Sequence, residues 1–221
     1  MTGRSSIDLV IFDCDGVLVD SEPTANFILT RALNREGLNI GRPSVARKTR
    51  GLAMTSVLIW AEDQLGRPLP DDFLAQVQKE TFAAFRQNLR AMPGVDVAVS
   101  SVKASGYQIC VASSGQREKM KLTLGLTGLL DQFEGRLFSA TEVGRGKPEP
   151  DLFLHAAREM GADPRNTVVV EDSLPGLLAA LHAGMQPFVY VPRGQGEPIF
   201  RDSATVFRRM SELPGLINLL D

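Results

Sequence analysis

The chain has too few cysteines for a disulfide framework or a zinc site. Only two, Cys14 and Cys110, occur among its 221 residues. Two cysteines cannot supply the four ligands of a structural zinc ion, and their separation fits no redox motif. Both lie in or beside apolar segments, so we expect them to be small buried hydrophobic residues.

Long apolar runs and an excess of one charge are also missing. No run approaches the ~20 residues that a membrane span requires, and the residues before Ile7 lack the apolar stretch of a signal peptide. The 24 basic and 26 acidic side chains give a net charge of −2, which excludes the broad basic field of a nucleic-acid-binding protein. We therefore expect a cytoplasmic protein with no membrane or nucleic-acid partner, and a monomer is the default expectation.

Short apolar segments separated by helical patterns are what the chain does have. The connections between these segments are long and helical, which favours right-handed β–α–β crossovers and hence a parallel sheet flanked by helices. Hydrophobic residues make up 43% of the chain and charged residues 23%, enough apolar material for such a core. The predicted strands are residues 9–12, 108–112, 137–138, 167–170, 188–191 and 205–207.

One connection is much longer than the others. More than ninety residues separate the first two predicted strands, far more than one crossover needs. Apolar side chains recur there at helical spacing, and Met92-Pro93-Gly94 marks the return to strand-forming sequence. We predict that residues 21–90 form a helical domain, the cap, inserted after the first strand. Residues 1–20 and 91–221 then form the α/β core.

Two carboxylates, Asp13 and Asp15, follow the first predicted strand directly. A buried carboxylate costs several kcal/mol unless a partner compensates its charge. Gly16 permits a sharp turn at this point, and the carboxyl edge of an open parallel sheet is where ligands bind. Taken alone, the motif predicts a metal site and an ordinary polar turn about equally.

Other polar residues follow the later strands. Ser113-Ser114-Gly115 ends the second strand, Glu171-Asp172-Ser173 ends the fourth, and Lys147 lies in a glycine- and proline-rich loop. Each alone is explained by a turn, a helix cap or a solvated loop. Because parallel strands end at the same edge of the sheet, we expect these side chains to converge. The predicted cluster is Asp13, Asp15, Ser113, Lys147, Glu171 and Asp172.

The charges of this cluster call for a cation. Each close pair of carboxylates repels by roughly 4 kcal/mol near a protein surface, and one lysine cannot offset four carboxylates. Hard oxygen ligands select Mg²⁺, which usually keeps several waters and takes substrate phosphate as well. Ser113 and Lys147 can donate to the remaining phosphate oxygens.

The order of these motifs along the chain, with Asp13 and Asp15 first, then Ser113, Lys147 and Glu171-Asp172, resembles that of the haloacid dehalogenase superfamily of hydrolases. Within it, the chain is similar to the β-phosphoglucomutase-like sugar-phosphate phosphatases, which carry a small helical cap after the first strand. The resemblance covers nearly the whole chain and is most specific at residues 8–22, 146–153 and 170–176. It implies a Rossmann-like core and Mg²⁺-dependent hydrolysis of a small phosphorylated metabolite, a sugar phosphate or a sugar-acid phosphate.

The resemblance also implies a role for each core motif. Asp13 would attack phosphorus and form an aspartyl-phosphate, and Asp15 would act as general acid and then general base. Asp13, the main-chain carbonyl of Asp15, and Asp172 would hold Mg²⁺. The transferring phosphoryl group would be bound by Ser113 and Lys147, with Glu171 orienting Lys147 or a metal-bound water. Further candidate substrate-binding residues are Ser114 and Gly115 in the core, and Lys48, Arg50 and Gly51 in the cap.

Alternatives remain open at several positions. Thr24 stands where β-phosphoglucomutases have a histidine, which favours a hydrolase over a phosphomutase; a non-catalytic binding protein on this fold is a third possibility. The basic cluster around Lys48 and Arg50 equally suits a solvated face. We expect His155 and His182 to be packing residues and Trp60 to pack within the cap. Residues 194–196, Gly-Gln-Gly, are expected to form a loop.

Overall fold

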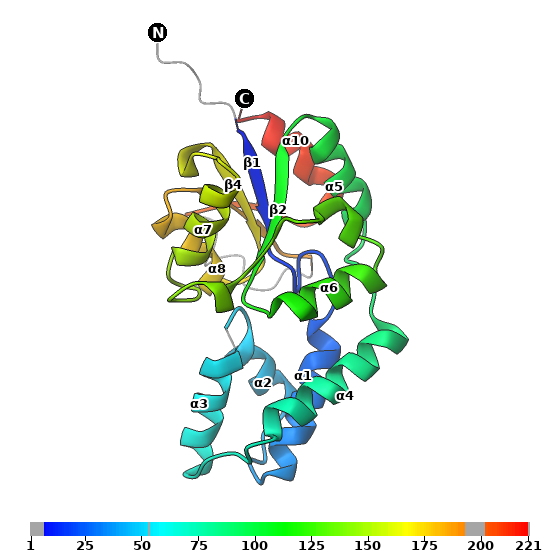
Figure 1. Cartoon of the computed structure of the whole chain (residues 1–221), viewed down its shortest axis with the longest axis vertical. Helices are drawn as coiled ribbons and strands as arrows, with labels where there is room; N and C mark the ends of the chain where they lie inside the picture. The colour runs from blue at the N-terminus through cyan, green and yellow to red at the C-terminus, as the bar shows by residue number, and fades with distance from the viewer. Residues whose placement is uncertain (1–6, 53, 193–201, 221) are drawn as a thin grey trace.

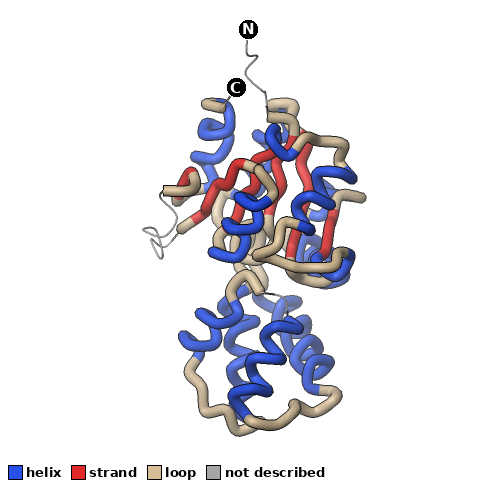
Figure 2. Tube along the Cα trace, turned by 90° about the vertical axis from the view of Figure 1, so that its left-hand side faces the viewer, coloured by secondary structure: helices blue, strands red, loops and turns tan. Residues whose placement is uncertain are grey.

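A parallel sheet forms the centre of the core in the computed structural model, which describes residues 7–52, 54–192 and 202–220. Figure 2 shows its strands between two layers of helices. The six strands follow the order β3-β2-β1-β4-β5-β6, so the predicted Rossmann-like α/β fold is confirmed. Their bounds are β1 Leu9–Phe12, β2 Gln108–Ser113, β3 Leu137–Ser139, β4 Thr167–Glu171, β5 Gln186–Tyr190 and β6 Thr205–Phe207.

Strand β1 is buried on both faces, as its uninterrupted apolar sequence predicts. Val10 and Phe12 pack on one face of the sheet, and Leu9 and Ile11 pack on the other. The first face is covered by α5 (Val95–Ala104), α6 (Arg117–Leu126) and α10 (Leu213–Asn218). The second is covered by α7 (Asp151–Glu159) and α8 (Leu174–His182). This packing places the carboxyl end of β1 at the middle of the sheet edge.

Four helices of the cap pack around an apolar core of their own. They are α1 (Glu22–Arg35), α2 (Arg42–Thr49), α3 (Met54–Leu65) and α4 (Phe73–Asn88). Figure 1 shows them below the sheet, on the side where β1 leads into α1. Leu29, Leu33, Val57 and Val77 are among the buried residues of this cluster. The cap helices therefore face the edge of the sheet at which the polar motifs were expected to meet.

Several smaller expectations can be compared with the structure. Cys14 and Cys110 are buried free cysteines, as predicted, and Trp60 packs against the cap core. His155 packs edge-on against Phe138, with ring centroids 5.5 Å apart.

The packing role expected for His182 is wrong, because this residue ends α8 at the surface and is exposed. The Gly-Gln-Gly stretch at 194–196 lies outside the described residues. Within the described part of the chain, no helix has the length and apolar character of a membrane span.

The turn from β4 into α8 is packed unusually closely. The Ser173 hydroxyl caps α8 by accepting a hydrogen bond from the Gly176 amide at 3.1 Å. Glu171 folds its carboxylate back over the first turn of the helix, so a Cβ atom on Gly176 would overlap that carboxylate. Glycine is therefore required at residue 176 for close approach, although its backbone is helical.

We expect Gly176→Ala to lower the free energy of unfolding by about 1–3 kcal/mol, because the added methyl group displaces a buried carboxylate. Urea unfolding followed by circular dichroism measures this change. Gly215→Ala is the matched control: it is also a helical glycine, but no atom lies within 4 Å of the added Cβ. The control should be neutral or stabilising by up to ~1 kcal/mol. Equal effects of the two substitutions would contradict the close packing at residue 176.

Candidate active site

The turn after β1 aims Asp13 and Asp15 at the edge of the sheet. The Asp13 amide continues the ladder by donating to the Val170 carbonyl at 2.9 Å. Cys14, between the two aspartates, points instead into the apolar core, as strand alternation predicts. Gly16 adopts a φ of +83°, and a Cβ there would lie 2.5 Å from an Asp172 carboxylate oxygen. The glycine thus allows the loops after β1 and β4 to meet.

Lys147 lies at the centre of the site. Its Nζ donates to Asp13 Oδ1 at 2.6 Å, to Glu171 Oε1 at 2.5 Å and to the Ala112 carbonyl at 3.3 Å. The side chain is 1% exposed, and the ammonium group lies 4.9 Å from the centre of the Phe153 ring. The loop between β3 and α7 therefore delivers the lysine to the carboxylates after β1 and β4, as the sequence predicted.

Glu171 is held on both of its carboxylate oxygens. One oxygen accepts from Lys147, and the other accepts from the amides of Asp172 and Ser173 and from the Ser173 hydroxyl, at 2.9–3.1 Å. These hydrogen bonds fix the orientation of the carboxylate. Its position agrees with the expected role of orienting Lys147.

Asp15 accepts hydrogen bonds from two side chains that were not predicted from the sequence. Lys119 Nζ donates to its Oδ2 at 2.7 Å, and the Ser21 hydroxyl donates to its Oδ1. Desolvation by burial raises the pKa of Asp15, but Lys119 and Ser21 outweigh it, so the pKa lies below its ordinary value. Lys119 lies one turn into the helix after Ser113-Ser114-Gly115, and that position is the signal that could have identified it.

Asp172 is paired with a residue of the cap. The Arg50 guanidinium donates to Asp172 Oδ2 from two nitrogens, at 2.8 and 3.1 Å. Burial raises the pKa of Asp172 well above its ordinary range, despite the opposing charge of Arg50. Arg50 also lies 3.7 Å from Glu22 at the start of α1. Of the basic cluster that the sequence singled out, Arg50 thus reaches the site, whereas Lys48 is exposed on α2 and does not line the cavity.

Ser113, Ser114 and Gly115 also line the site. Ser113 is buried, and its hydroxyl accepts a hydrogen bond from the Gly115 amide at 3.2 Å. The Ser114 hydroxyl donates to the Gly51 carbonyl at 3.2 Å, which joins the end of β2 to the cap loop. The structure therefore brings together the predicted site residues of the core and, from the cap, Arg50 and Gly51.

The buried charges of this site are unbalanced. Burial and the neighbouring carboxylates Glu171 and Asp15 raise the pKa of Asp13 to about 7, although Lys147 lowers it. Desolvation lowers the pKa of Lys147, but Asp13 and Glu171 outweigh it and raise that pKa above its ordinary value. The lysine is therefore cationic, and the carboxylates around it still repel one another.

The donor set fits a hard divalent cation. Asp13, Glu171 and Asp172 each offer a carboxylate oxygen, and these oxygens all lie within 4.8 Å of one another. All three residues are buried, and oxygen-only donors suit Mg²⁺ better than a transition metal. This grouping contains Asp13 and Asp172 from the predicted metal ligands. The Asp15 side chain is instead engaged by Lys119 and Ser21, and a ligand role for its main-chain carbonyl stays a prediction.

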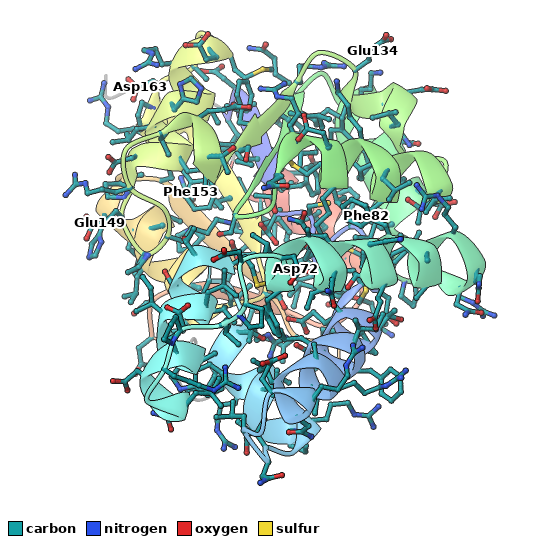
Figure 3. All side chains as sticks on the ribbon, turned by 60° about the horizontal axis from the view of Figure 1, so that its bottom comes forward. Asp72, Phe82, Glu134, Glu149, Phe153 and Asp163 are labelled. Atoms are coloured by element: carbon teal, nitrogen blue, oxygen red, sulfur yellow. The ribbon has the colours of Figure 1, made fainter. Side chains whose placement is uncertain are left out.

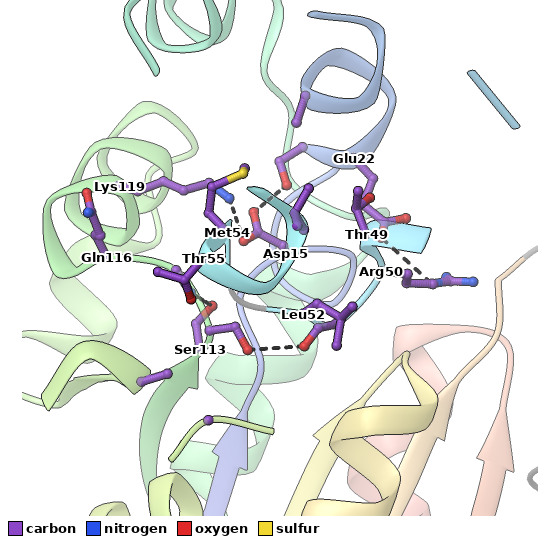
Figure 4. Close-up of a pocket in the computed structure, with 18 of the residues that line it drawn as sticks. Asp15, Glu22, Thr49, Arg50, Leu52, Met54, Thr55, Ser113, Gln116 and Lys119 are labelled. Atoms are coloured by element: carbon purple, nitrogen blue, oxygen red, sulfur yellow. Dashed lines mark hydrogen bonds and ion pairs between the residues drawn. The ribbon is translucent and has the colours of Figure 1, made fainter. Parts of the chain in front are cut away.

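A cavity of about 420 Å³ opens over Asp13, Asp15 and Asp172, between the core and the cap. Figure 4 shows Asp15 and Lys119 pointing toward one another in it, with Thr49, Arg50 and Leu52 of the cap opposite. Its volume is in the range of sites for small organic ligands. These three carboxylates lie on the core side, and the cap side is formed by helices α1, α3 and α4 together with residues 49–52.

We expect Lys147→Met to lower the free energy of unfolding by about 3–5 kcal/mol at neutral pH, because two buried carboxylates lose the cation between them. Urea unfolding of metal-free protein measures the change. Lys121→Met, at an exposed position of α6, is the control and should change stability by less than about 0.5 kcal/mol. A similar loss in both variants would show that the ion pairs of Lys147 with Asp13 and Glu171 do not contribute more to the free energy of unfolding than an exposed lysine does.

Comparisons with known proteins agree with this geometry. The sequence model of the haloacid dehalogenase-like hydrolases matches residues 7–184. The chain is 30% identical over 213 residues to the 6-phosphogluconate phosphatase of Escherichia coli K12, covering 96% of this chain and 95% of that protein. It is 30% identical over 203 residues to hexitol phosphatase B of the same strain, covering 90% and 91%.

A solved structure shares the fold over the same length. The haloacid dehalogenase family hydrolase of Deinococcus radiodurans R1, determined with bound phosphate and sodium, is 29% identical to this chain. The TM-score is 0.77, and the match covers 98% of this chain and 97% of that one. The chain belongs to the haloacid dehalogenase-like hydrolases, as its motifs indicated.

Proposed function

We propose that the protein is a Mg²⁺-dependent phosphatase that hydrolyses a small phosphorylated metabolite, a sugar phosphate or a sugar-acid phosphate, through an aspartyl-phosphate on Asp13. One observation carries this proposal: Lys147 joins Asp13 to Glu171, beside Asp172, on the core side of a cavity that the cap covers. At the level of enzyme class, the chain is a phosphoric monoester hydrolase, which agrees with its family and with the phosphatases among its relatives. The substrate, the metal and the intermediate are the proposed part.

In this proposal, Asp13 attacks phosphorus. Lys147 holds its Oδ1 at 2.6 Å, which orients the carboxylate and leaves the second oxygen to form the bond. A fixed near-attack geometry removes much of the entropic barrier to the reaction. Lys147 and Ser113 would then bind the transferring phosphoryl oxygens, where negative charge is concentrated.

In this proposal, Asp15 transfers protons to the leaving alkoxide and from the hydrolytic water. Its lowered pKa makes it a carboxylate before substrate binds, the state that accepts a proton from the hydrolytic water. To protonate the leaving alkoxide first, it must take up a proton as the phosphate enters, and the incoming negative charge favours that uptake. The partners Lys119 and Ser21 hold the carboxylate in place through both steps.

Mg²⁺ would be held by Asp13, the main-chain carbonyl of Asp15, and Asp172. When bound, it supplies positive charge that offsets the repulsion between these carboxylates and the phosphoryl oxygens. For this to happen, Asp172 must share its carboxylate between the cation and Arg50, which bonds to Oδ2 alone. Glu171 would keep Lys147 directed at the phosphoryl group throughout.

The alternative of a phosphomutase is not favoured. Several curated relatives are named as phosphatases of phosphorylated carbohydrates or related compounds, and Thr24 stands in place of the mutase histidine. Labelled water separates the two reactions. We expect ¹⁸O from water to appear in free phosphate, whereas isomerised sugar phosphate without phosphate release would contradict hydrolysis.

Asp13→Asn should reduce turnover of p-nitrophenyl phosphate with Mg²⁺ by about 10³-fold or more, because an amide is a poor nucleophile. A steady-state assay measures the loss, and circular dichroism checks that the fold is retained. The comparison variant is Asp8→Asn, an exposed aspartate just before β1, which should keep its activity. A nearly active Asp13→Asn enzyme would mean that another group attacks phosphorus.

Metal-free Asp13→Asn should also be more stable than the parent, and increasingly so as the pH rises. The folded-state pKa of Asp13, about 7, exceeds its ordinary value of 3.8, so ionisation of this carboxyl opposes folding. The opposition is absent below about pH 4, grows between the two pKa values and levels off above pH 7. Urea unfolding in EDTA across this range measures the difference, and a gap that shrinks with rising pH would be the opposite result.

Asp15→Asn should distinguish leaving groups. An alkoxide needs a proton to depart, whereas p-nitrophenolate leaves without one, so we expect the variant to lose about 10²–10⁴-fold on an alkyl phosphate and clearly less on p-nitrophenyl phosphate. Measuring kcat/KM for both esters tests this. Equal losses would indicate that Asp15 acts only through the structure of the site.

A further inference from the structure

Helices α1, α3 and α4 of the cap contribute almost no charge to the wall of the cavity. The residues that α1, α3 and α4 contribute to the lining are Glu22, Ala25, Asn26, Leu29, Met54, Thr55, Val57, Leu74, Val77, Gln78, Thr81 and Phe82. None of them is a lysine, an arginine or a histidine, and the single charged member is an acid. Among the described residues, these three helices therefore offer no cation to a second anionic group on a substrate.

The cations that do line the cavity are already engaged. Lys119 is paired with Asp15 at 2.7 Å, and Arg50 is paired with Asp172 at 2.8 Å and lies 3.7 Å from Glu22. Both act on the carboxylates near the core, where the phosphoryl group is expected. An additional carboxylate or phosphate on the leaving group would face the apolar wall, close to Glu22. Desolvating an unpaired charge in such a place is costly.

The same wall suits an uncharged, hydroxyl-bearing molecule. Leu74, Val77 and Phe82 of α4 present apolar surface on which the C–H faces of a polyol or a sugar can pack. Between them, Gln78 Nε2 donates to Gln116 Oε1 of the core at 3.3 Å, so two amides are available for hydroxyl groups. Figure 3 shows α4, which carries Phe82, running beside the core helix α6.

We propose that this cavity selects monophosphate esters of uncharged polyols or sugars, and that it discriminates against sugar-acid phosphates and bisphosphates. Gln78 is the specificity-determining residue at the centre of the wall. The proposal rests on the proposed phosphatase function and narrows it: of the two substrate classes that the sequence left open, it retains the sugar phosphates and excludes the sugar acids.

Two esters that differ at one carbon provide the test. Glucitol 6-phosphate ends in a CH₂OH group where 6-phosphogluconate has a carboxylate. With saturating Mg²⁺, we expect kcat/KM to be at least about tenfold higher for the glucitol ester, as expected for an unpaired charge in the cavity. The same order is expected when the two compounds are compared as competitive inhibitors of p-nitrophenyl phosphate hydrolysis.

A charge placed in the wall should reverse the preference. Gln78→Lys should raise the ratio of kcat/KM for 6-phosphogluconate to that for glucitol 6-phosphate by about tenfold, because the new ammonium can meet the carboxylate. Gln76→Lys is the matched control. It makes the same substitution on the same helix, at an exposed position that does not line the cavity, and should leave the ratio unchanged.

The possible failures are distinguishable. If the enzyme hydrolyses p-nitrophenyl phosphate but binds and turns over both esters equally, or prefers 6-phosphogluconate, the charge argument is wrong and the phosphatase assignment stands. An unchanged ratio in Gln78→Lys would likewise overturn the role of Gln78. If no phosphate ester is hydrolysed with Mg²⁺ present, the proposed function itself fails, and this inference fails with it.

Discussion

Repulsion between carboxylates gathered at one edge of a parallel sheet is the constraint on which this structure depends. Asp13, Glu171 and Asp172 are all buried there, and each is more costly to bury because the others are present. Two buried or partly buried cations from different segments offset this repulsion. They are Lys147, from the loop after β3, and Arg50, from the cap. These ion pairs join parts of the chain that are remote in sequence, so the charge that serves chemistry also holds the loops together.

Arg50 makes the position of the cap depend on this charge balance. It reaches Asp172 from the loop between α2 and α3, 122 residues away in sequence, while the Ser114 hydroxyl contacts the neighbouring Gly51 carbonyl. A cation bound to Asp172 would weaken the ion pair between Asp172 and Arg50. Under the proposed function, closure of the cap and occupation of the acidic cluster would be linked through Asp172, as expected of a lid that excludes water during reaction and then opens.

Much of the fold could be predicted from the sequence because its strands are short apolar runs ended by polar residues. Strands β1 and β6 begin and end where predicted, and the carboxyl ends of β1, β2 and β4 brought Asp13, Ser113 and Glu171 together as expected. The partners of Asp15 could not be predicted in this way. Lys119 depends on how α6 is rotated about its axis, and Ser21 lies at the N-cap of α1 but directs its hydroxyl to Asp15 rather than to the helix. Such contacts depend on tertiary packing, which local patterns do not encode.

The charges also divide the cavity into two parts with different tolerance for change. On the core side, Lys147 is the cation that Asp13 and Glu171 share, so its removal leaves two buried carboxylates without that partner. On the α4 side, Val77, Gln78 and Phe82 belong to none of the site's ion pairs, so a substitution there alters the shape and polarity of the cavity but not the charge balance. A fold built in this way can keep one phosphoryl-transfer site while the cap changes the alcohol that it accepts. This is why 30% identity to phosphatases of a sugar acid and of hexitols defines the reaction better than the substrate, and why the wall of α4 is the place to look for the difference.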